Sequence, residues 1–259
     1  MKKLYTKLNT RREKWLAAIG AGLFWLALWQ LAAVLADQEL LIPAPAVTAR
    51  ILWAQLALPS FWHAVAGSVF RVIAGFFCAV IAGCLLAVLT ARFRLARVLL
   101  SPALQVVRAV PVASFILLAY VWFSADALPV FISFLMVLPL IWANVEQGIH
   151  RTDRKLLEMS AVYRLSRRRI WLHIRIPSVM PYLLAACTTG LGFAWKAAVA
   201  AEILRNPVNA IGRLLWRAKA TYDQPEVFAY TAVVVVLSIL LERLLLAAVR
   251  RLGPRFGET

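Results

Sequence analysis

The apolar runs of this chain are the feature that most constrains its fold. A helix that crosses the hydrocarbon core of a bilayer needs about 20 predominantly apolar residues, and several stretches reach that length. The stretches expected to span are 15–36, 68–91, 98–123, 129–149, 179–204 and 226–249. The composition agrees, because 63% of the residues are hydrophobic and 16% are charged, whereas about a quarter of a soluble domain is charged. The sequence therefore predicts an all-α polytopic membrane protein with about six transmembrane helices and no separate soluble domain.

The basic residues are distributed unevenly between the linkers. Of the 29 lysines and arginines, 21 fall on one side of the predicted topology and five on the other. This is the positive-inside pattern, so the net charge of +17 does not indicate a nucleic-acid partner. We expect a basic cytoplasmic tail at 1–14, a transmembrane domain at 15–249 with a cytoplasmic segment at 150–177, and a cytoplasmic tail at 250–259. The first apolar run is longer than a signal-peptide core, so a retained helix is expected in a multi-pass protein of the cell membrane.

Prolines and polar residues modify the helical pattern at three places. Pro102 and Pro111 interrupt the third run, where a kinked or broken helix is expected. The stretch 47–58 is too short to span and is predicted to form an interfacial helix. The stretch 205–225 is polar enough to lie outside, as a short helix and a loop.

The basic segment 150–177 also carries apolar residues at helical spacing. They include Leu157, Ala161, Tyr163, Leu165, Ile170 and Ile174. A pair of short amphipathic helices that presents these side chains to a cytoplasmic partner explains the pattern. A helix that lies on the anionic inner leaflet through its arginines explains it equally well. The physical pattern alone leaves both interpretations open.

The spacing of three residues in this segment resembles a known family motif. In the EAA loop of ABC importer permeases, Glu-Ala-Ala is followed after three residues by Gly and after nine more by Ile-x-Leu-Pro. Glu158 matches the Glu, Ile174 the Ile and Pro177 the Pro. The position between the fourth and fifth predicted spans is also that of the family.

Two of the departures from the motif matter for its structure. Ser160 replaces the second Ala, and Arg164 replaces the Gly. The Gly is expected at positive φ, where another residue costs on the order of 1 kcal/mol. Either the turn is reshaped, or Leu165 and Ser166 form it, with Ser166 capping the second helix.

Other stretches resemble the nitrate, sulfonate and taurine branch of the same family. They are Leu41-Ile-Pro-Ala-Pro, Arg108-Ala-Val-Pro111, Trp122-Phe123-Ser124, where the branch has Trp-Phe-Gly, and Ala200-Ala-Glu202. With them the resemblance covers most of the chain. The departures at Ser124 and Arg164 indicate a divergent member.

The resemblance implies a type I ABC importer permease fold and a pathway that works by alternating access. The implied partners are ATP-binding cassette ATPase subunits, an extracytoplasmic substrate-binding protein and a second permease copy, in a homodimer. The chain has no GxxxxGK[ST] phosphate loop, so ATP and Mg are expected in the ATPase, and no catalytic residue, cofactor or metal site is expected here. The implied ATPase-coupling residues are Glu158, Ser160, Ala161, Arg164, Leu165, Ile174 and Pro177. The implied cargo is a small anion such as a sulfonate or nitrate, or a vitamin precursor.

Charged residues within the predicted spans are candidates for the pathway. An intramembrane charge usually faces protein or water and often has a function. Lys196 either attracts an anionic substrate or forms a structural pair, with Glu202 six residues further on or with another helix. Arg108 is either a pathway residue or part of a helix turn, and Arg71 is expected to snorkel at the outer end of its span.

Three other classes of membrane protein make different demands on the sequence. A secondary transporter needs ion-coupling carboxylates at mid-membrane, and Glu202 is the one weak candidate. A membrane enzyme needs a catalytic cluster, but His63, His150 and His173 lie far apart in sequence. A membrane scaffold without an ATPase partner fits the composition but does not explain the spaced motif from Glu158 to Pro177.

Overall fold

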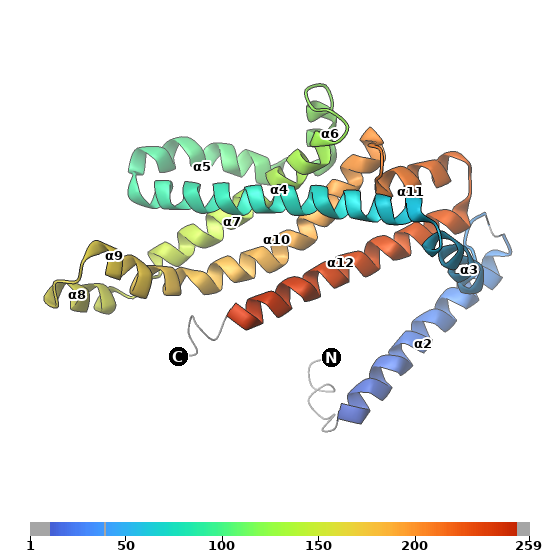
Figure 1. Ribbon diagram of the computed structural model, residues 1–259, viewed down its shortest axis with the longest axis horizontal. Coiled ribbons are helices and arrows are strands. Elements are labelled where there is room, and N and C mark those ends of the chain that lie inside the picture. The colour runs from blue at the N-terminus through green and yellow to red at the C-terminus, as the bar shows by residue number, and fades with distance from the viewer. Residues whose placement is uncertain (1–10, 39, 253–259) are drawn as a thin grey trace. The chain divides into compact units, whose positions relative to one another are not determined.

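The computed structural model describes residues 11–38 and 40–252, and every regular element in these ranges is a helix (Figure 1). The elements are α2 (Arg11–Ala36), α3 (Pro45–Leu56), α4 (Pro59–Arg92), α5 (Arg94–Ala109), α6 (Val112–Ala119), α7 (Ala127–His150), α8 (Arg154–Val162), α9 (Arg167–Ile170), the π-helix η1 (Trp171–Arg175), α10 (Ile176–Arg205), α11 (Ile211–Ala220) and α12 (Gln224–Leu252).

The six predicted spans correspond to helices of the structure. Among the described residues, five helices are long and apolar enough to cross a membrane, and the bent pair α5–α6 has the length and composition of a sixth span if the two helices count as one. The short helices expected at 47–58 and within 205–225 are α3 and α11. The predicted tails fall largely on residues 1–10 and 253–259, which lie outside the described residues.

The third span is broken at one of its two prolines. Pro102 lies inside α5, whereas the chain bends by 105° between α5 and α6. At the break Val110 is extended, with φ −77° and ψ 133°, because a residue that precedes proline is disfavoured in the helical conformation. The expected break at Pro111 is therefore confirmed, and an interruption at Pro102 was wrong. A helix in a membrane tolerates the loss of one hydrogen bond at proline when its neighbours satisfy the freed carbonyl.

The described residues form two compact units. One comprises residues up to 59 together with 217–232, and the other comprises 60–216 together with the residues from 233 onward. In the first unit the indole Nε1 of Trp29 donates to the carbonyl of Pro43 at 3.1 Å, and its ring stacks on Phe228 at 6.0 Å between centroids. Gln55 of α3 donates to the Oε1 atom of Glu226 at 2.9 Å. These contacts join α2, α3 and the start of α12.

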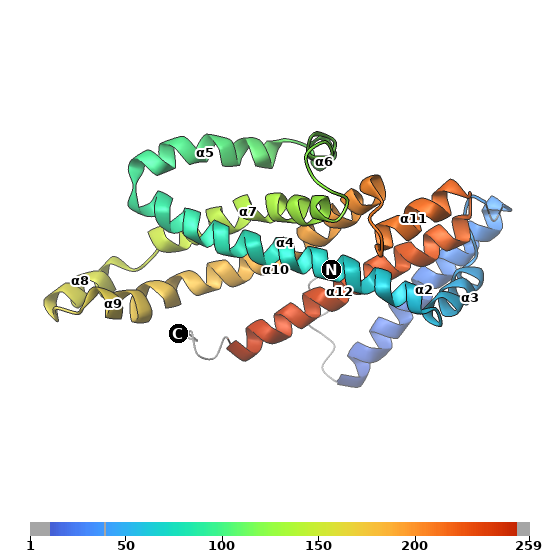
Figure 2. The same ribbon diagram turned by 45° about the horizontal axis from the view of Figure 1, so that its top comes forward.

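In the second unit, α10 packs along α7, and α4 lies against α7 (Figures 1 and 2). Glycines allow the approach of α4 to α7. A Cβ atom on Gly83 would lie 2.8 Å from Ile141, and one on Gly75 would collide with the carbonyl of Val130. Small residues at helix contacts are the usual means by which membrane helices pack closely. The core of α4, α7 and α10 supports the helical segment between α7 and α10 and a buried polar group on α4 and α10.

Candidate functional site

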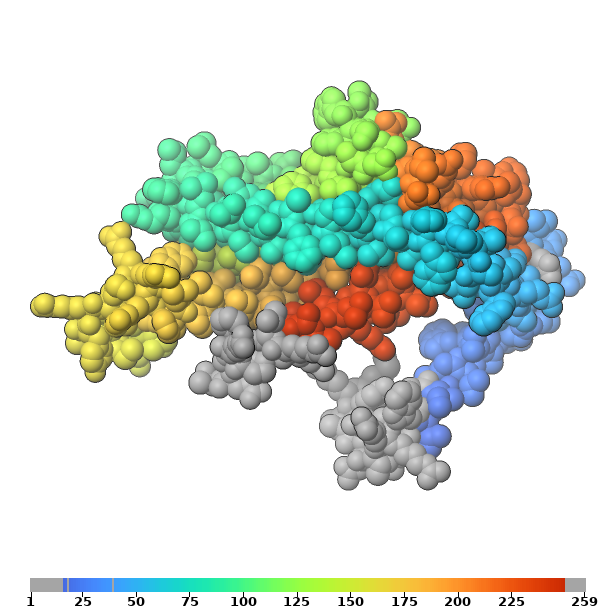
Figure 3. Space-filling model, in the orientation of Figure 1, coloured from blue at the N-terminus to red at the C-terminus, as the bar shows by residue number. Residues whose placement is uncertain are grey.

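The segment that carries the motif lies at the end where α7 stops and α10 begins. It consists of α8, α9 and η1, which follow one another at that end of both long helices (Figures 1 and 2). In the space-filling view this segment, coloured yellow, projects past the end of α4 (Figure 3). The start of α8 is fixed by Asp153, whose side chain accepts a hydrogen bond from the N–H of Lys155 at 2.8 Å, as an N-cap residue does.

The turn after α8 is centred on Arg164. Its N–H donates to the carbonyl of Ala161 at 3.1 Å, and the N–H of Leu165 donates to the carbonyl of Ser160 at 2.9 Å. These two bonds define a Schellman motif, in which the residue at C′ adopts the left-handed conformation. Arg164 has φ 49°, so it takes the conformation expected of the Gly that it replaces. Both expectations were therefore wrong, since the turn is neither reshaped nor moved to Leu165 and Ser166. Ser166 precedes α9, but its side chain makes no capping bond.

The motif residues divide into a buried and an exposed set. Ser160 and Ile174 are buried, and the hydroxyl of Ser160 donates to the carbonyl of Leu157 at 2.7 Å. The exposed motif residues are Glu158, Ala161 and Arg164, and Leu165 and Pro177 are partly exposed. The segment therefore has a side that anchors it and a side that is open.

Two further exposed apolar residues complete the open side. Val162 is 79% exposed and Tyr163 is 72% exposed. Glu158 and Val162 are four residues apart on α8, so they share a face. Among the described residues Glu158 has no ion-pair partner. The sequence pattern pointed to Tyr163 but not to Val162, although Val162 lies four residues after Glu158 and so on the same helix face.

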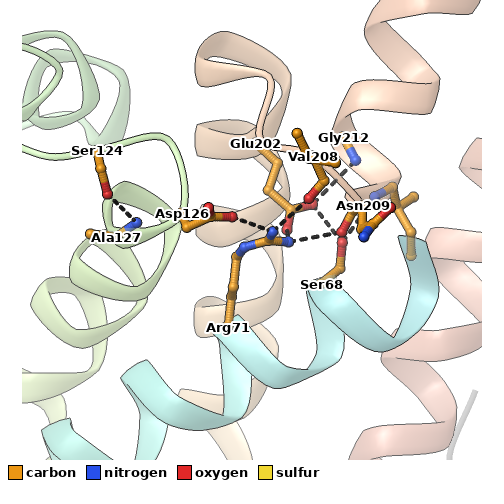
Figure 4. Close-up of polar contacts among 10 residues, drawn as sticks. Ser68, Arg71, Ser124, Asp126, Ala127, Glu202, Val208, Asn209 and Gly212 are labelled. Atoms are coloured by element: carbon orange, nitrogen blue, oxygen red, sulfur yellow. Dashed lines mark hydrogen bonds and ion pairs between the residues drawn. The ribbon is translucent and has the colours of Figure 1, made fainter. Parts of the chain in front are cut away.

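A second group of polar residues lies buried at the other end of α10 (Figure 4). Glu202 has no exposed surface. Its Oε2 atom accepts hydrogen bonds from the hydroxyl of Ser68 at 2.7 Å and from the N–H of Gly212 at 3.2 Å, and its Oε1 atom lies 3.3 Å from Nη1 of Arg71. The hydroxyl of Ser68 in turn accepts from the N–H of Ile211 at 2.9 Å. A carboxylate thus lies at the N-terminus of α11, where the helix dipole and the free N–H groups stabilise negative charge.

Arg71 links this group to two loops. Its guanidinium donates to the carbonyls of Val208 at 2.8 Å and Asn209 at 3.0 Å, and Nη2 lies 2.5 Å from the carboxylate of Asp126. The side chain of Arg71 is only 9% exposed, whereas that of Asp126 is 71% exposed. Arg71 therefore holds α4, α10, the loop before α11 and the turn before α7 together.

The buried group overturns two expectations. Arg71 does not snorkel to the surface but is buried in ion pairs, because acceptors from three other segments surround it. Glu202 pairs with Arg71 and not with Lys196, and its burial and bonding place it away from any open surface. Sequence reasoning saw both charges, but their separation of 131 residues gives no local pattern that would pair them.

Arg108 and Lys196, the other two candidate pathway residues, lie on open surface. Arg108 and the residues of the α5–α6 break line a cavity of about 430 Å³, together with Phe193 of α10. Lys196 follows Phe193 by one helical turn and is exposed. Among the described residues neither cation has an ion-pair partner. A lysine facing hydrocarbon would be costly, so this face of α10 needs water or protein against it.

The described residues contain no group of three or more His, Cys, Asp or Glu side chains that could hold a metal ion. In the buried polar group the hydroxyl of Ser68 is bonded to Glu202, but both side chains have no exposed surface and cannot meet a substrate there. The arrangement therefore defines a multi-span membrane protein with one projecting helical segment, a class to which transport subunits belong.

Comparison with known proteins identifies the family. Residues 79–258 match the family model of the binding-protein-dependent transport system inner membrane component, and the chain belongs to this family. It is therefore a multi-pass protein of the cell inner membrane and a permease component of the ABC transporter type. The predicted resemblance and fold class are confirmed.

Several relatives of the chain are permeases, and two of those described here are named for different solutes. The chain is 29% identical over 238 residues to a putative aliphatic sulfonates transport permease of Escherichia coli, covering 90% of this chain and 88% of the relative. It is 28% identical over 229 residues to the riboflavin transport system permease of Chloroflexus aurantiacus, covering 85% of each. It is also 30% identical over 189 residues to a "probable ABC transporter permease protein" of Brucella melitensis, covering 73% of this chain and 76% of the relative.

The fold agrees with a solved transporter. A chain of the inward-facing methionine ABC transporter superposes with a TM-score of 0.56 at 18% identity, covering 76% of this chain and 94% of that chain.

Proposed function

We propose that this chain forms the substrate pathway of an ATP-driven importer and receives the motion of a separate ATPase through residues 154–177. Two copies of the chain enclose the pathway, two ATPase subunits bind the cytoplasmic α8–η1 segments, and an external binding protein delivers the cargo. ATP and Mg are bound by the ATPase. The permease family of the chain supports the coarse assignment.

One observation carries the coupling assignment. The side of α8 that bears Glu158 and Val162 is open, whereas Ser160 of α8 and Ile174 of η1 are buried, and η1 packs on α10. An amphipathic helix with an open apolar side fits a groove on a partner. Its anchored side would pass a displacement to the long helices, since packed elements move as rigid bodies between discrete states.

The cargo proposed for the pathway is a small anion. Arg108 and Lys196 are open cations on the α5–α6 break and α10, and neither is neutralised by a described carboxylate. Cations that face a water-filled path attract anions. Among the relatives, one has a name that specifies aliphatic sulfonates and another bicarbonate; a vitamin such as the riboflavin of a third relative is the second candidate.

The test of the coupling assignment is co-purification from native membranes in mild detergent. A tagged wild-type chain is expected to bring down an ATPase subunit, and the double variant Glu158→Ala, Ala161→Arg is expected to lose it. Tyr222→Arg is the matched control, because Tyr222 is exposed in a turn at positive φ after α11. The assignment fails if folded wild type brings down no ATPase, and a secondary transporter or scaffold then becomes the better description.

A further inference from the structure

A cavity separate from the open face of α10 lies beside η1. It has a volume of about 160 Å³. Its walls come from three helices, with Val88 of α4, Val145 and Ile149 of α7, and Met180 and Leu183 of α10. The cavity is open to the surface, since its lining residues Val88 and Ile176 are exposed. An open groove with apolar walls is a site that hydrocarbon can occupy.

One charged residue lines this apolar cavity. Arg175 is partly exposed, and its guanidinium carbon lies 4.8 Å from the ring centroid of Trp171, which also lines the cavity. The stacking holds the guanidinium plane in place and leaves its N–H groups available. Among the described residues no carboxylate forms an ion pair with Arg175.

The backbone here is a π-helix over Trp171–Arg175. Such turns are rare and occur frequently at functional sites. Trp171 and Arg175, the two residues of the stacking contact, are the first and last residues of this π-helix.

The charges around the cavity favour an anion. Arg167, Arg168 and Arg169 are exposed on the preceding helix α9. The sequence contains no Asp or Glu between Glu158 and Glu202. Glu146 of α7, next to Val145 in the cavity wall, is paired with Arg97 at 3.1 Å, so it does not neutralise Arg175.

We propose that this cavity binds one anionic phospholipid of the inner leaflet, with its phosphate on Arg175 and part of an acyl chain between α4, α7 and α10. Guanidinium recognises phosphate through paired hydrogen bonds, and the cytoplasmic leaflet is the anionic one. The inference rests on the proposed function for its orientation, which places η1 at the cytoplasmic surface. The lipid lies where the α8–η1 segment joins the spans.

The test is lipid titration of the detergent-solubilised full-length chain, read by native mass spectrometry. The probes are phosphatidylglycerol, phosphatidylcholine with the same acyl chains, and glycerol phosphate, which carries the anionic group without the chains. We expect one phosphatidylglycerol to bind about fivefold more tightly than phosphatidylcholine, the factor typical of one basic residue near the surface. Glycerol phosphate is expected not to displace it.

Three variants locate the site. Arg175→Gln is expected to abolish the preference for phosphatidylglycerol, and Arg175→Lys to retain part of it. Val88→Phe is expected to weaken both lipids by filling the cavity. Arg213→Gln removes the same charge from α11, beyond the other end of α10, and is expected to behave as wild type.

The proposal is overturned by equal binding of the two lipids, by a preference that Arg175→Gln retains, or by displacement with glycerol phosphate, which would make a free anion the ligand. ATPase co-purification is measured on the same preparations. If the ATPase co-purifies and the lipid preference is absent, only the lipid site is wrong. If the preference is present in a chain that brings down no ATPase, the site stands and the coupling assignment falls.

Discussion

The carboxylate of Glu202 and the guanidinium of Arg71 lie 3.3 Å apart in the core, although 131 residues separate them in sequence. Each has further partners, so the pair belongs to a group that also holds the N-terminus of α11 through Ser68 and Gly212. Burying two charges is costly, and their attraction offsets that cost only when every donor and acceptor is satisfied. The pair therefore ties distant segments to one arrangement.

Removal of one partner from this pair should destabilise the protein strongly. Glu202→Ala leaves Arg71 buried with one fewer anion, and the expected loss is about 3–5 kcal/mol. The measurement is thermal unfolding in detergent. Arg71→Met with Glu202→Leu is the comparison, since it leaves neither charge of the pair buried. It should recover only part of the lost stability, because the N–H of Gly212 and the carbonyls of Val208 and Asn209 lose their partners. If the stability losses of Arg71→Met alone and of Glu202→Leu alone add up to the loss of the double variant, the two residues are not coupled.

Replacing Arg164 with Gly should stabilise the turn after α8. Arg164 has φ 49°, a conformation that costs a non-glycine residue about 1–2 kcal/mol. Arg164→Gly is therefore expected to raise the unfolding temperature while keeping ATPase co-purification. Arg168→Gly is the contrast, because Arg168 lies in the helical α9, where Gly is destabilising by about 0.5–1 kcal/mol. A decrease in stability for both variants would contradict the turn geometry.

The approach of α4 to α7 should not tolerate a side chain at Gly83. A Cβ atom there would lie 2.8 Å from Ile141, so Gly83→Val is expected to destabilise by about 1–3 kcal/mol or more. Gly192→Val is the matched control, since a Cβ atom on Gly192 of α10 meets nothing within 4 Å. Thermal unfolding of both variants, side by side, measures the difference, and similar stabilities would argue against this helix contact.

Lys196 should influence uptake through its charge. If Lys196 lines an anion pathway, Lys196→Gln lowers uptake of the anionic cargo into proteoliposomes that hold the whole transporter. An attraction of about 1.4 kcal/mol between Lys196 and the anion corresponds to a decrease of about tenfold. Lys196→Arg keeps the charge and is expected to retain most of the uptake. Unchanged uptake by Lys196→Gln, with ATPase activity intact, would remove Lys196 from the pathway.

The spans could be predicted because apolar length and basic linkers are local properties of sequence. The motif marked residue 164 as the turn position, but the expectation that Arg would reshape or shift the turn was wrong, because Arg164 adopts the positive φ itself. Two results lay beyond sequence reasoning. Pro102 and Pro111 look alike in sequence, but only the second breaks the helix, since neighbouring helices decide whether a freed carbonyl is satisfied. The Arg71–Glu202 pair depends on a contact between distant helices, which periodicity does not encode.

The bend between α5 and α6 has a consequence for the number of crossings. Arg97, near the start of α5, bonds to Glu146 at 3.1 Å and contacts His150 at 2.6 Å near the end of α7, so these two ends lie on one side of the membrane. Since α7 crosses once, α5 and α6 together must also cross once. The 16 residues of α5 extend about 24 Å, which is less than the hydrocarbon thickness of about 30 Å. Because α6 turns by 105° away from α5, it adds no rise along the α5 axis, and the corner between the two helices should lie within the thickness of the bilayer.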